Sequence, residues 1–285
     1  MKLTPAYLPI DYKPPIDLLK DKVALVTGAG QGLGKVAALA FAEHGASVIL
    51  HGRNIPKLEA VYDAIVAAGF PQPAILPMDY LKTTQTELDE FVQSIQTTFG
   101  QLDIIFHAAS HFVSCMPLAS HDLDMWQKHT RINIAVPAAL TKSCMPLLEG
   151  AVDASVIFLT ESHAVEPKAF WGAFATSKSA LATLTAIWAD EMAGRTKVRL
   201  NLCLPGPVAS PMRSRSHPWR VRIRVAHDGI IGTIFSLSRR TGQFTTIRHA
   251  AQLRDKSGKY SVTVQSYKAR YVPILVWIWV TYGKL

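Results

Sequence analysis

The chain has 285 residues, of which 49% are hydrophobic and 18% are charged, so it can build an apolar core and is not intrinsically disordered. Three scattered cysteines exclude a disulfide framework and a Cys-x-x-Cys metal knuckle, and they favour a reducing compartment. The formal charge of +9 does not by itself indicate an anionic partner, because residues 1–211 hold 16 basic and 19 acidic side chains whereas residues 212–285 hold 14 and 2.

This uneven charge divides the chain into three predicted parts. We expect an N-terminal arm over 1–20, a main domain over 21–211 and an atypical basic segment over 212–285. The first residues contain no continuous apolar segment of the kind found in signal peptides. The apolar run Tyr271–Tyr282 is shorter than the roughly 20 residues of a membrane-spanning helix. We therefore expect a cytoplasmic protein without a membrane partner, and a buried strand pair or an exposed apolar tail at Tyr271–Tyr282.

The main domain alternates short apolar runs with amphipathic stretches. Leu33, Val36 and Phe41 recur at helical spacing, and so do Leu88 and Ile95. Unbroken apolar strands joined by helical crossovers predict an α/β fold, a Rossmann-type doubly wound parallel sheet with helices on both faces. The expected strands are 23–26, 48–50, 74–76, 102–106, 156–159 and 198–204.

A glycine-rich segment joins the first expected strand to the first helix. It reads Thr27-Gly28-Ala29-Gly30-Gln31-Gly32-Leu33-Gly34. Glycines allow a tight turn and let a pyrophosphate approach the unpaired N–H groups of the helix N-terminus. Because the segment lies between a strand and a helix, it predicts a dinucleotide site; a glycine turn with a purely structural role is the alternative.

The residues after the second expected strand bear on which dinucleotide binds. An acidic residue there commonly binds the adenosine ribose of NAD, whereas this chain has Arg53. An arginine can pair with the 2′-phosphate of NADP, so NADP is favoured over NAD. A solvated surface arginine remains the alternative.

The segment Thr27–Gly34 resembles the Thr-Gly-x-x-x-Gly-x-Gly fingerprint of the short-chain dehydrogenase/reductase family. Further matches follow in the family's order over residues 11–213, and the chain looks most similar to the bacterial YciK-like members. They are Asp79, His107-Ala108-Ala109-Ser110, Asn133, Ser177-Lys178 and Pro205-Gly206. The resemblance implies hydride transfer between a nicotinamide and a carbonyl or alcohol. It also implies a cofactor site made of Thr27, Gly28, Gly30, Gln31, Gly32, Leu33, Gly34, Arg53, Asp79, Ala108, Ala109, Lys178, Pro205 and Gly206.

The catalytic residues that the resemblance implies are only partly present. In the family a tyrosine four residues before the lysine exchanges a proton with the substrate, a serine binds the substrate oxygen, and a helix asparagine helps to hold a relay water. Asn133 and Lys178 match, but Phe174 and Glu161 stand at the tyrosine and serine positions, with Ser162 beside Glu161. Because phenylalanine has no O–H group, we expect carbonyl reduction to be lost or greatly reduced.

Two hypotheses for the function follow from these replacements. In the first, the chain is a pseudoenzyme that binds NADP and acts as a scaffold or sensor. In the second, it is an active oxidoreductase in which Glu161, Ser162 or a water held by Lys178 supplies the proton. The carbonyl or alcohol substrate is not identified by the sequence.

Other candidate sites and partners are less well supported by the sequence. His107 and His111 fall at a strand end and in a loop without a third ligand in register, so we predict no metal site. The cysteines Cys115, Cys144 and Cys203 are expected to be buried and unreactive. The helix from about Phe174 carries surplus apolar surface, and the resemblance implies that copies pair there as a homodimer or homotetramer.

The basic last quarter departs from the family pattern. Arginine alternates with valine and isoleucine between Arg213 and Arg224, but Trp219 is the one aromatic residue among them, which argues against a nucleic-acid partner. Residues 219–229 and 248–285 no longer resemble the family. A reading-frame change and a non-family extension are both open explanations.

Overall fold

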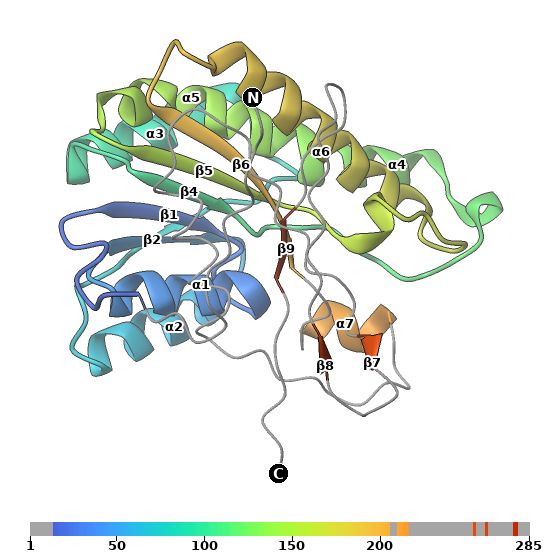
Figure 1. Cartoon of the computed structure of the whole chain (residues 1–285), viewed down its shortest axis with the longest axis horizontal. Coiled ribbons are helices and arrows are strands. Elements are labelled where there is room, and N and C mark those ends of the chain that lie inside the picture. The colour runs from blue at the N-terminus through green and yellow to red at the C-terminus, as the bar shows by residue number, and fades with distance from the viewer. Residues whose placement is uncertain (1–13, 206–209, 217–252, 255–259, 262–275, 279–285) are drawn as a thin grey trace.

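The structure, a computed structural model, describes residues 14–205 and 210–216, together with the backbone of 253–254, 260–261 and 276–278. Its centre is a parallel sheet with the strand order β3-β2-β1-β4-β5-β6-β9 (Figure 1). The strands are β1 Val23–Thr27, β2 Ser47–Gly52, β3 Ala74–Pro77, β4 Ile104–His107, β5 Ala154–Leu159, β6 Val198–Pro205 and β9 Val276–Ile278. The predicted Rossmann-type sheet and its six strands are confirmed.

Helices cover both faces of this sheet (Figure 1). One face carries α1 Gly32–Glu43 and α2 Ile55–Ala67, and the other carries α3 Gln85–Phe99, α5 Val136–Gly150 and α6 Gly172–Met192. The remaining helices are α4 Leu123–Thr130 and α7 Pro211–Ser216, with short turns η1 Leu118–Ser120, η2 Arg131–Ala135 and η3 Ser162–Ala164. An antiparallel pair joins β7 Leu253–Arg254 to β8 Tyr260–Ser261.

Two apolar cores explain why the strands are continuously hydrophobic. Successive side chains of β1 face opposite ways, so Leu25 enters the core under α3, α5 and α6 while Val26 enters the core under α1 and α2. Phe41 of α1 meets Phe106 of β4 edge to face, with ring centroids 6.0 Å apart. Burial of each such side chain contributes roughly 1.5–3 kcal/mol, so the sheet is stabilised from both sides.

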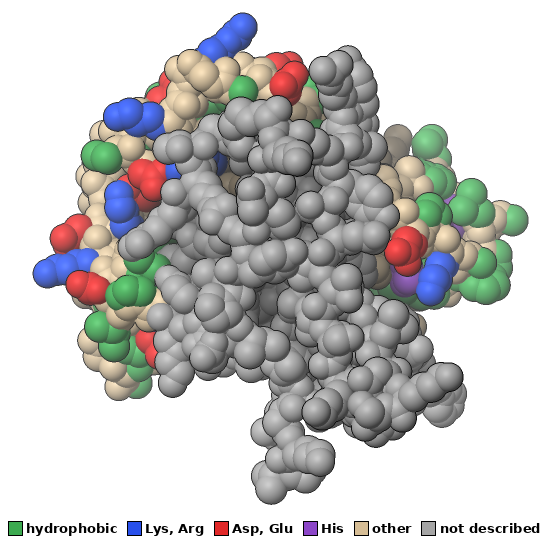
Figure 2. All heavy atoms as spheres, in the orientation of Figure 1, with side chains coloured by type: hydrophobic (Ala, Val, Ile, Leu, Met, Phe, Trp, Pro, Cys, Tyr) green, Lys and Arg blue, Asp and Glu red, His purple; other side chains and the backbone are tan. Residues whose placement is uncertain are grey.

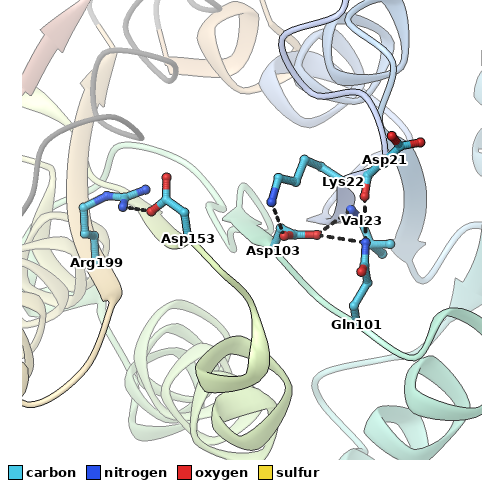
Figure 3. Close-up of polar contacts among 7 residues, drawn as sticks. All are labelled: Asp21, Lys22, Val23, Gln101, Asp103, Asp153 and Arg199. Atoms are coloured by element: carbon cyan, nitrogen blue, oxygen red, sulfur yellow. Dashed lines mark hydrogen bonds and ion pairs between the residues drawn. The ribbon is translucent and has the colours of Figure 1, made fainter.

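A polar cluster holds the amino ends of the strands (Figure 3). The buried carboxylate of Asp103 accepts hydrogen bonds from Lys22 Nζ at 2.8 Å and from Val23 N at 2.9 Å. Arg199 at the start of β6 pairs with Asp153 before β5. Polar contacts thus connect the strands at their amino ends. The side chains at the carboxyl ends of the strands take no part in these contacts.

The described surface is mixed in charge. On the face shown in Figure 2, acidic and basic side chains intermix on the side that carries α2 and α3, while apolar side chains gather on the projection beside α4. Leu118 and Leu123 are 63% and 72% exposed. Among the helices that the structure describes, none combines the length and apolar character needed to cross a bilayer.

The last quarter is described only in part. Val276–Ile278, within the apolar run Tyr271–Tyr282, pairs in parallel with β6 and extends the sheet by one strand. Trp219, residues 219–229 and most of 248–285 lie outside the described residues. At the other end of the chain, Leu19 is buried and its N–H donates to His44 O at 2.9 Å, so part of the predicted arm packs on the main domain.

A neutral histidine is built into this core. His51, near the end of β2, is 1% exposed, and its Nδ1 lies 2.8 Å from Leu76 O. Its ring packs against Tyr80 and Phe91, with centroids 5.2 Å and 5.0 Å away. Burial lowers the pKa of His51 to about 4, although the hydrogen bond to Leu76 opposes that shift.

We predict that His51 makes the fold acid-sensitive. In the unfolded chain His51 titrates near its ordinary pKa, so as the pH falls the unfolded state takes up the proton first. Its contribution to stability is complete above about pH 6.5 and is lost toward pH 4, an effect of about 2 kcal/mol between pH 7 and pH 5. In His51→Phe, the fall in the free energy of unfolding between these pH values should shrink by that amount in urea titrations. Equal falls in both proteins would contradict the prediction.

Candidate functional site

The predicted site residues lie at the carboxyl ends of the strands, the edge where ligands bind in open α/β sheets. Each set belongs to the end of one strand: Thr27 ends β1 and is followed by Gly28, Gly30, Gln31, Gly32, Leu33 and Gly34; Arg53 comes after β2; Asp79 after β3; Ala108 and Ala109 after β4; Glu161 and Ser162 after β5; and Pro205 ends β6. Asn133 lies in η2, and Phe174 and Lys178 lie in α6. Gly206 lies outside the described residues.

Close backbone contacts require glycine in the turn after β1. Gly28 has φ +69°, and a Cβ there would lie 2.8 Å from Ala109 N. A Cβ on Gly34 would lie 2.2 Å from Gly28 O, well inside contact distance. Thr27 Oγ1 accepts a hydrogen bond from Ala109 N at 3.1 Å, which ties the turn to the loop after β4.

The turn leads into a helix N-terminus that is suited to an anion. Gln31, the N-cap of α1, makes no capping hydrogen bond with its side chain, and the first turn has no acidic residue. The Gln31 side chain instead accepts a hydrogen bond from Lys57 Nζ at 2.7 Å. The first amides of the helix and the positive end of its dipole therefore suit a phosphate group.

Basic side chains lie near His111 in the loop after β4. Arg53 is exposed just after β2. Burial, together with the charges of His129, Arg53, Lys128 and Arg215, lowers the pKa of His111 to about 4. Asp79 is engaged locally, since its Oδ1 accepts a hydrogen bond from Leu81 N at 3.1 Å. The cationic side chains produce a positive electrostatic potential around His111 and Arg53, at the carboxyl ends of the strands.

Lys178 is a buried cation at the centre of the site. Its side chain, on α6, donates a hydrogen bond from Nζ to Leu159 O at 2.9 Å. Nζ also lies 5.9 Å from the centroid of the Phe174 ring. Burial lowers the pKa of Lys178 to about 8, and the negative charge of Glu161 opposes this shift.

Phe174 lies in a cluster of aromatic side chains. Phe174 is 3% exposed, and its ring lies 5.1 Å from that of Phe112 and 6.0 Å from that of Trp171. Phe112 and Trp171 also contact each other, with centroids 5.6 Å apart. Phe112 was not predicted as a site residue, because the sequence marks it only as an apolar residue in the loop after β4. We call Phe112, Trp171 and Phe174 the aromatic cluster.

Glu161 contributes a carboxylate whose charge acts on Lys178. Its Oε1 is buried and has no hydrogen-bond partner among the described residues. Its Oε2 accepts a hydrogen bond from Ser162 Oγ at 3.4 Å. Burial raises the pKa of Glu161, while hydrogen bonds from the amides of His163 and Ala164 and from Ser162, together with the charge of Lys178, oppose the shift. The site therefore contains a partly desolvated acid, one oxygen of which has no hydrogen-bond partner among the described residues.

Asn133 braces the floor of the site from a π-helical turn, a backbone feature that is frequent at functional sites. Its Oδ1 accepts a hydrogen bond from His111 N at 2.7 Å, and its Nδ2 donates to Ser177 Oγ at 2.9 Å and to His111 O at 3.1 Å. Ser177 Oγ in turn donates to Phe174 O at 2.8 Å. Asn133 thus links the loop after β4 to α6.

Two further predictions can be compared with the structure. His107 is buried and stacks on Phe158 with centroids 4.7 Å apart, while His111 lies in the loop, and no group of three candidate metal ligands occurs among the described residues. Cys144 and Cys203 are buried as expected, but Cys115 is exposed, so its predicted burial is wrong. Cys115 lies in the long loop between β4 and η1, where the sheet does not cover it.

Comparison with known proteins agrees with this arrangement. Residues 22–221 match the family model described as short chain dehydrogenase. The oxidoreductase YciK of Escherichia coli K12 is 34% identical over 207 residues, which cover 73% of this chain and 81% of YciK. A short chain dehydrogenase structure from Pseudomonas syringae has a TM-score of 0.77 at 35% identity, covering 80% of this chain and 93% of that one. One from Escherichia coli CFT073, complexed with NADPH, has a TM-score of 0.75 at 31% identity, covering 81% and 94%.

The glycine contacts generate a stability prediction. Gly34→Ala forces a Cβ against Gly28 O and should lower the free energy of unfolding by roughly 3 kcal/mol, the upper range for overpacked sites. Gly150→Ala is the control, because a Cβ there meets nothing within 4 Å. It should change stability by less than about 1 kcal/mol. Urea denaturation of both variants measures the difference, and equal stabilities would contradict the assigned contact.

Proposed function

The chain belongs to the short-chain dehydrogenase family, and from this premise we propose that it binds NADP but has lost most carbonyl reduction. The observation that carries the proposal is Phe174, a buried phenylalanine 5.9 Å from the Lys178 ammonium group. Reduction of a carbonyl needs a proton donor within hydrogen-bond reach of the oxygen. Phe174 cannot donate one.

The proposed NADP site uses the strand ends described above. The turn Gly28–Gly34 and the uncapped N-terminus of α1 suit the pyrophosphate. Arg53 suits the 2′-phosphate, and Lys178 suits the hydroxyl groups of the nicotinamide ribose. When bound, NADPH supplies a hydride. The NADPH-bound relative supports this assignment, since its fold and sequence are similar.

The chain's own residues then position the reactants without supplying a proton from residue 174. Asn133 holds the loop at His111 in place. The aromatic cluster excludes water from the same region because its rings pack against one another. On this proposal the protein holds NADP firmly and turns over carbonyl compounds slowly, which also suits a scaffold or sensor.

A second candidate keeps the oxidoreductase activity and assigns the proton to Glu161. It is favoured by the buried Oε1 without a partner among the described residues and by the raised pKa of the carboxyl, which burial causes. Ser162 is less suited, because its hydroxyl donates to Glu161. The water held by Lys178 is a weaker alternative, because Leu159 O already accepts from Nζ.

We also propose that copies of the chain associate through α6 as a homodimer or homotetramer. The helix exposes apolar surface around Leu184, Ile187 and Trp188, and Ile187 is 56% exposed.

The domain boundaries that we propose are those expected from the sequence: an arm over 1–20, a main domain over 21–211 and a basic segment over 212–285.

The cofactor assignment predicts a selective loss of affinity. Arg53→Leu should weaken NADPH binding about tenfold or more, since a hydrogen-bonded charge pair contributes about 1.5–3 kcal/mol, and it should leave NADH binding nearly unchanged. Arg195→Leu removes an exposed arginine from the turn between α6 and β6, at the opposite edge of the sheet, and should change neither affinity. Titration by nucleotide fluorescence measures all four changes. An equal loss for NADPH and NADH in Arg53→Leu would contradict the role of Arg53.

The activity assignment predicts a gain of function. Phe174→Tyr restores a hydroxyl beside Lys178 and should raise carbonyl reduction by about a hundredfold or more, the usual contribution of a positioned acid. Phe99→Tyr adds a hydroxyl at the far end of α3 and should have no effect. NADPH oxidation is followed with a panel of aldehydes and ketones. If the unmodified protein reduces carbonyls at about 1 per second or faster, the proposed loss of activity is wrong.

A further inference from the structure

We propose that the substrate of this site is an iminium cation, a compound with a positively charged C=N group, in place of a carbonyl compound. The inference rests on the proposed binding of NADPH. It is drawn from three features: the lack of a hydroxyl proton at Phe174, the buried Oε1 atom of Glu161 without a hydrogen-bond partner among the described residues, and the aromatic cluster around Phe174.

The described hydroxyl groups around Lys178 already donate to protein acceptors. Ser177 Oγ donates to Phe174 O at 2.8 Å, and Thr160 Oγ1 donates to Lys178 O at 3.2 Å. Ser162 Oγ donates to Glu161, and Ser179 Oγ donates to Ala164 O. These hydroxyl groups are therefore poorly placed to give a proton to a substrate during its reduction.

An iminium cation needs no such proton. Its carbon accepts a hydride, with two electrons, from the reduced nicotinamide, and the π pair of the C=N bond becomes the lone pair of the amine nitrogen. The nicotinamide leaves in its oxidised form, and the product is a neutral amine. The positive charge that a carbonyl gains only by protonation is present in this substrate from the start, so Phe174 is no obstacle.

The positive charge of such a substrate is complementary to Glu161 and Phe174, the residues at the positions of the family's serine and tyrosine. Glu161 Oε1 has no hydrogen-bond partner among the described residues and can stabilise a cation at close range in a partly desolvated site. Aromatic faces attract cations, and the Lys178 ammonium group already lies over the Phe174 ring. Glu161 is also the carboxylate whose charge acts on Lys178, so it offsets the repulsion between that ammonium group and a bound cation.

Binding of a cation that cannot be reduced tests the inference apart from turnover. The probe is N,N-dimethyl-tetrahydroisoquinolinium, and its neutral isostere is dimethyltetralin; both are titrated by calorimetry into the full chain saturated with NADPH. We expect the cation to bind at least about tenfold more tightly, a preference of about 1.4 kcal/mol. In Glu161→Gln this preference should disappear. In Glu149→Gln, which removes an exposed carboxylate at the end of α5, it should persist.

Turnover supplies the second readout. NADPH oxidation by N-methyl-dihydroisoquinolinium, corrected for the reaction without protein, should be at least about tenfold faster than with tetralone, a ketone of similar size, and Glu161→Gln should remove this advantage. Equal binding of cation and isostere, or equal rates with iminium and ketone, overturns the inference. The comparisons on the unmodified chain remain decisive if Glu161→Gln does not fold. Loss of NADPH binding itself contradicts the proposed function, so the two failures are distinguishable.

Discussion

The buried ammonium group of Lys178 is the interaction on which the site depends. Nζ is held by Leu159 O at the end of β5, lies over the Phe174 ring and is offset by the charge of Glu161. A buried charge is costly unless it is paired and hydrogen-bonded, so these contacts must form together. They fix α6 against the carboxyl end of the sheet, where the glycine turn and Asn133 also converge.

The fold was predictable because a parallel sheet covered on both faces demands apolar strands, and the chain shows six of them. The boundaries were less predictable. The fourth strand starts at Ile104, not at the expected Leu102, and before it Asp103 uses its side chain to bind Val23 N and Lys22 Nζ at the amino ends of the strands. The helix expected from about Phe174 begins at Gly172, where a Cβ would meet the His121 ring. At both boundaries the contacts join segments that are far apart in the sequence, and local patterning does not encode such contacts.

The candidate site was predictable where its residues belong to a motif and unpredictable where they meet only in space. The glycine turn, Asn133 and Lys178 follow from spacing along the chain. Phe112 does not, because its contact with Phe174 depends on how the loop after β4 packs against α6. The exposure of Cys115 on that loop was missed for the same reason. Sequence spacing also identified Glu161 but gave no sign that Oε1 is buried without a partner among the described residues.

That carboxylate bears on whether the site has merely decayed. A site released from chemistry gains stability by replacing buried polar groups with apolar ones, since an unsatisfied buried group costs about 1–3 kcal/mol. On the proposed correspondence with the family, Phe174 is the apolar replacement, whereas Glu161 introduces a charge where a serine would carry none. The first replacement is expected to stabilise the fold and the second to destabilise it, so loss of function alone does not explain both. Both replacements fit a site for a cationic ligand. Such a ligand needs no proton donor at residue 174, and its positive charge is stabilised by the carboxylate of Glu161.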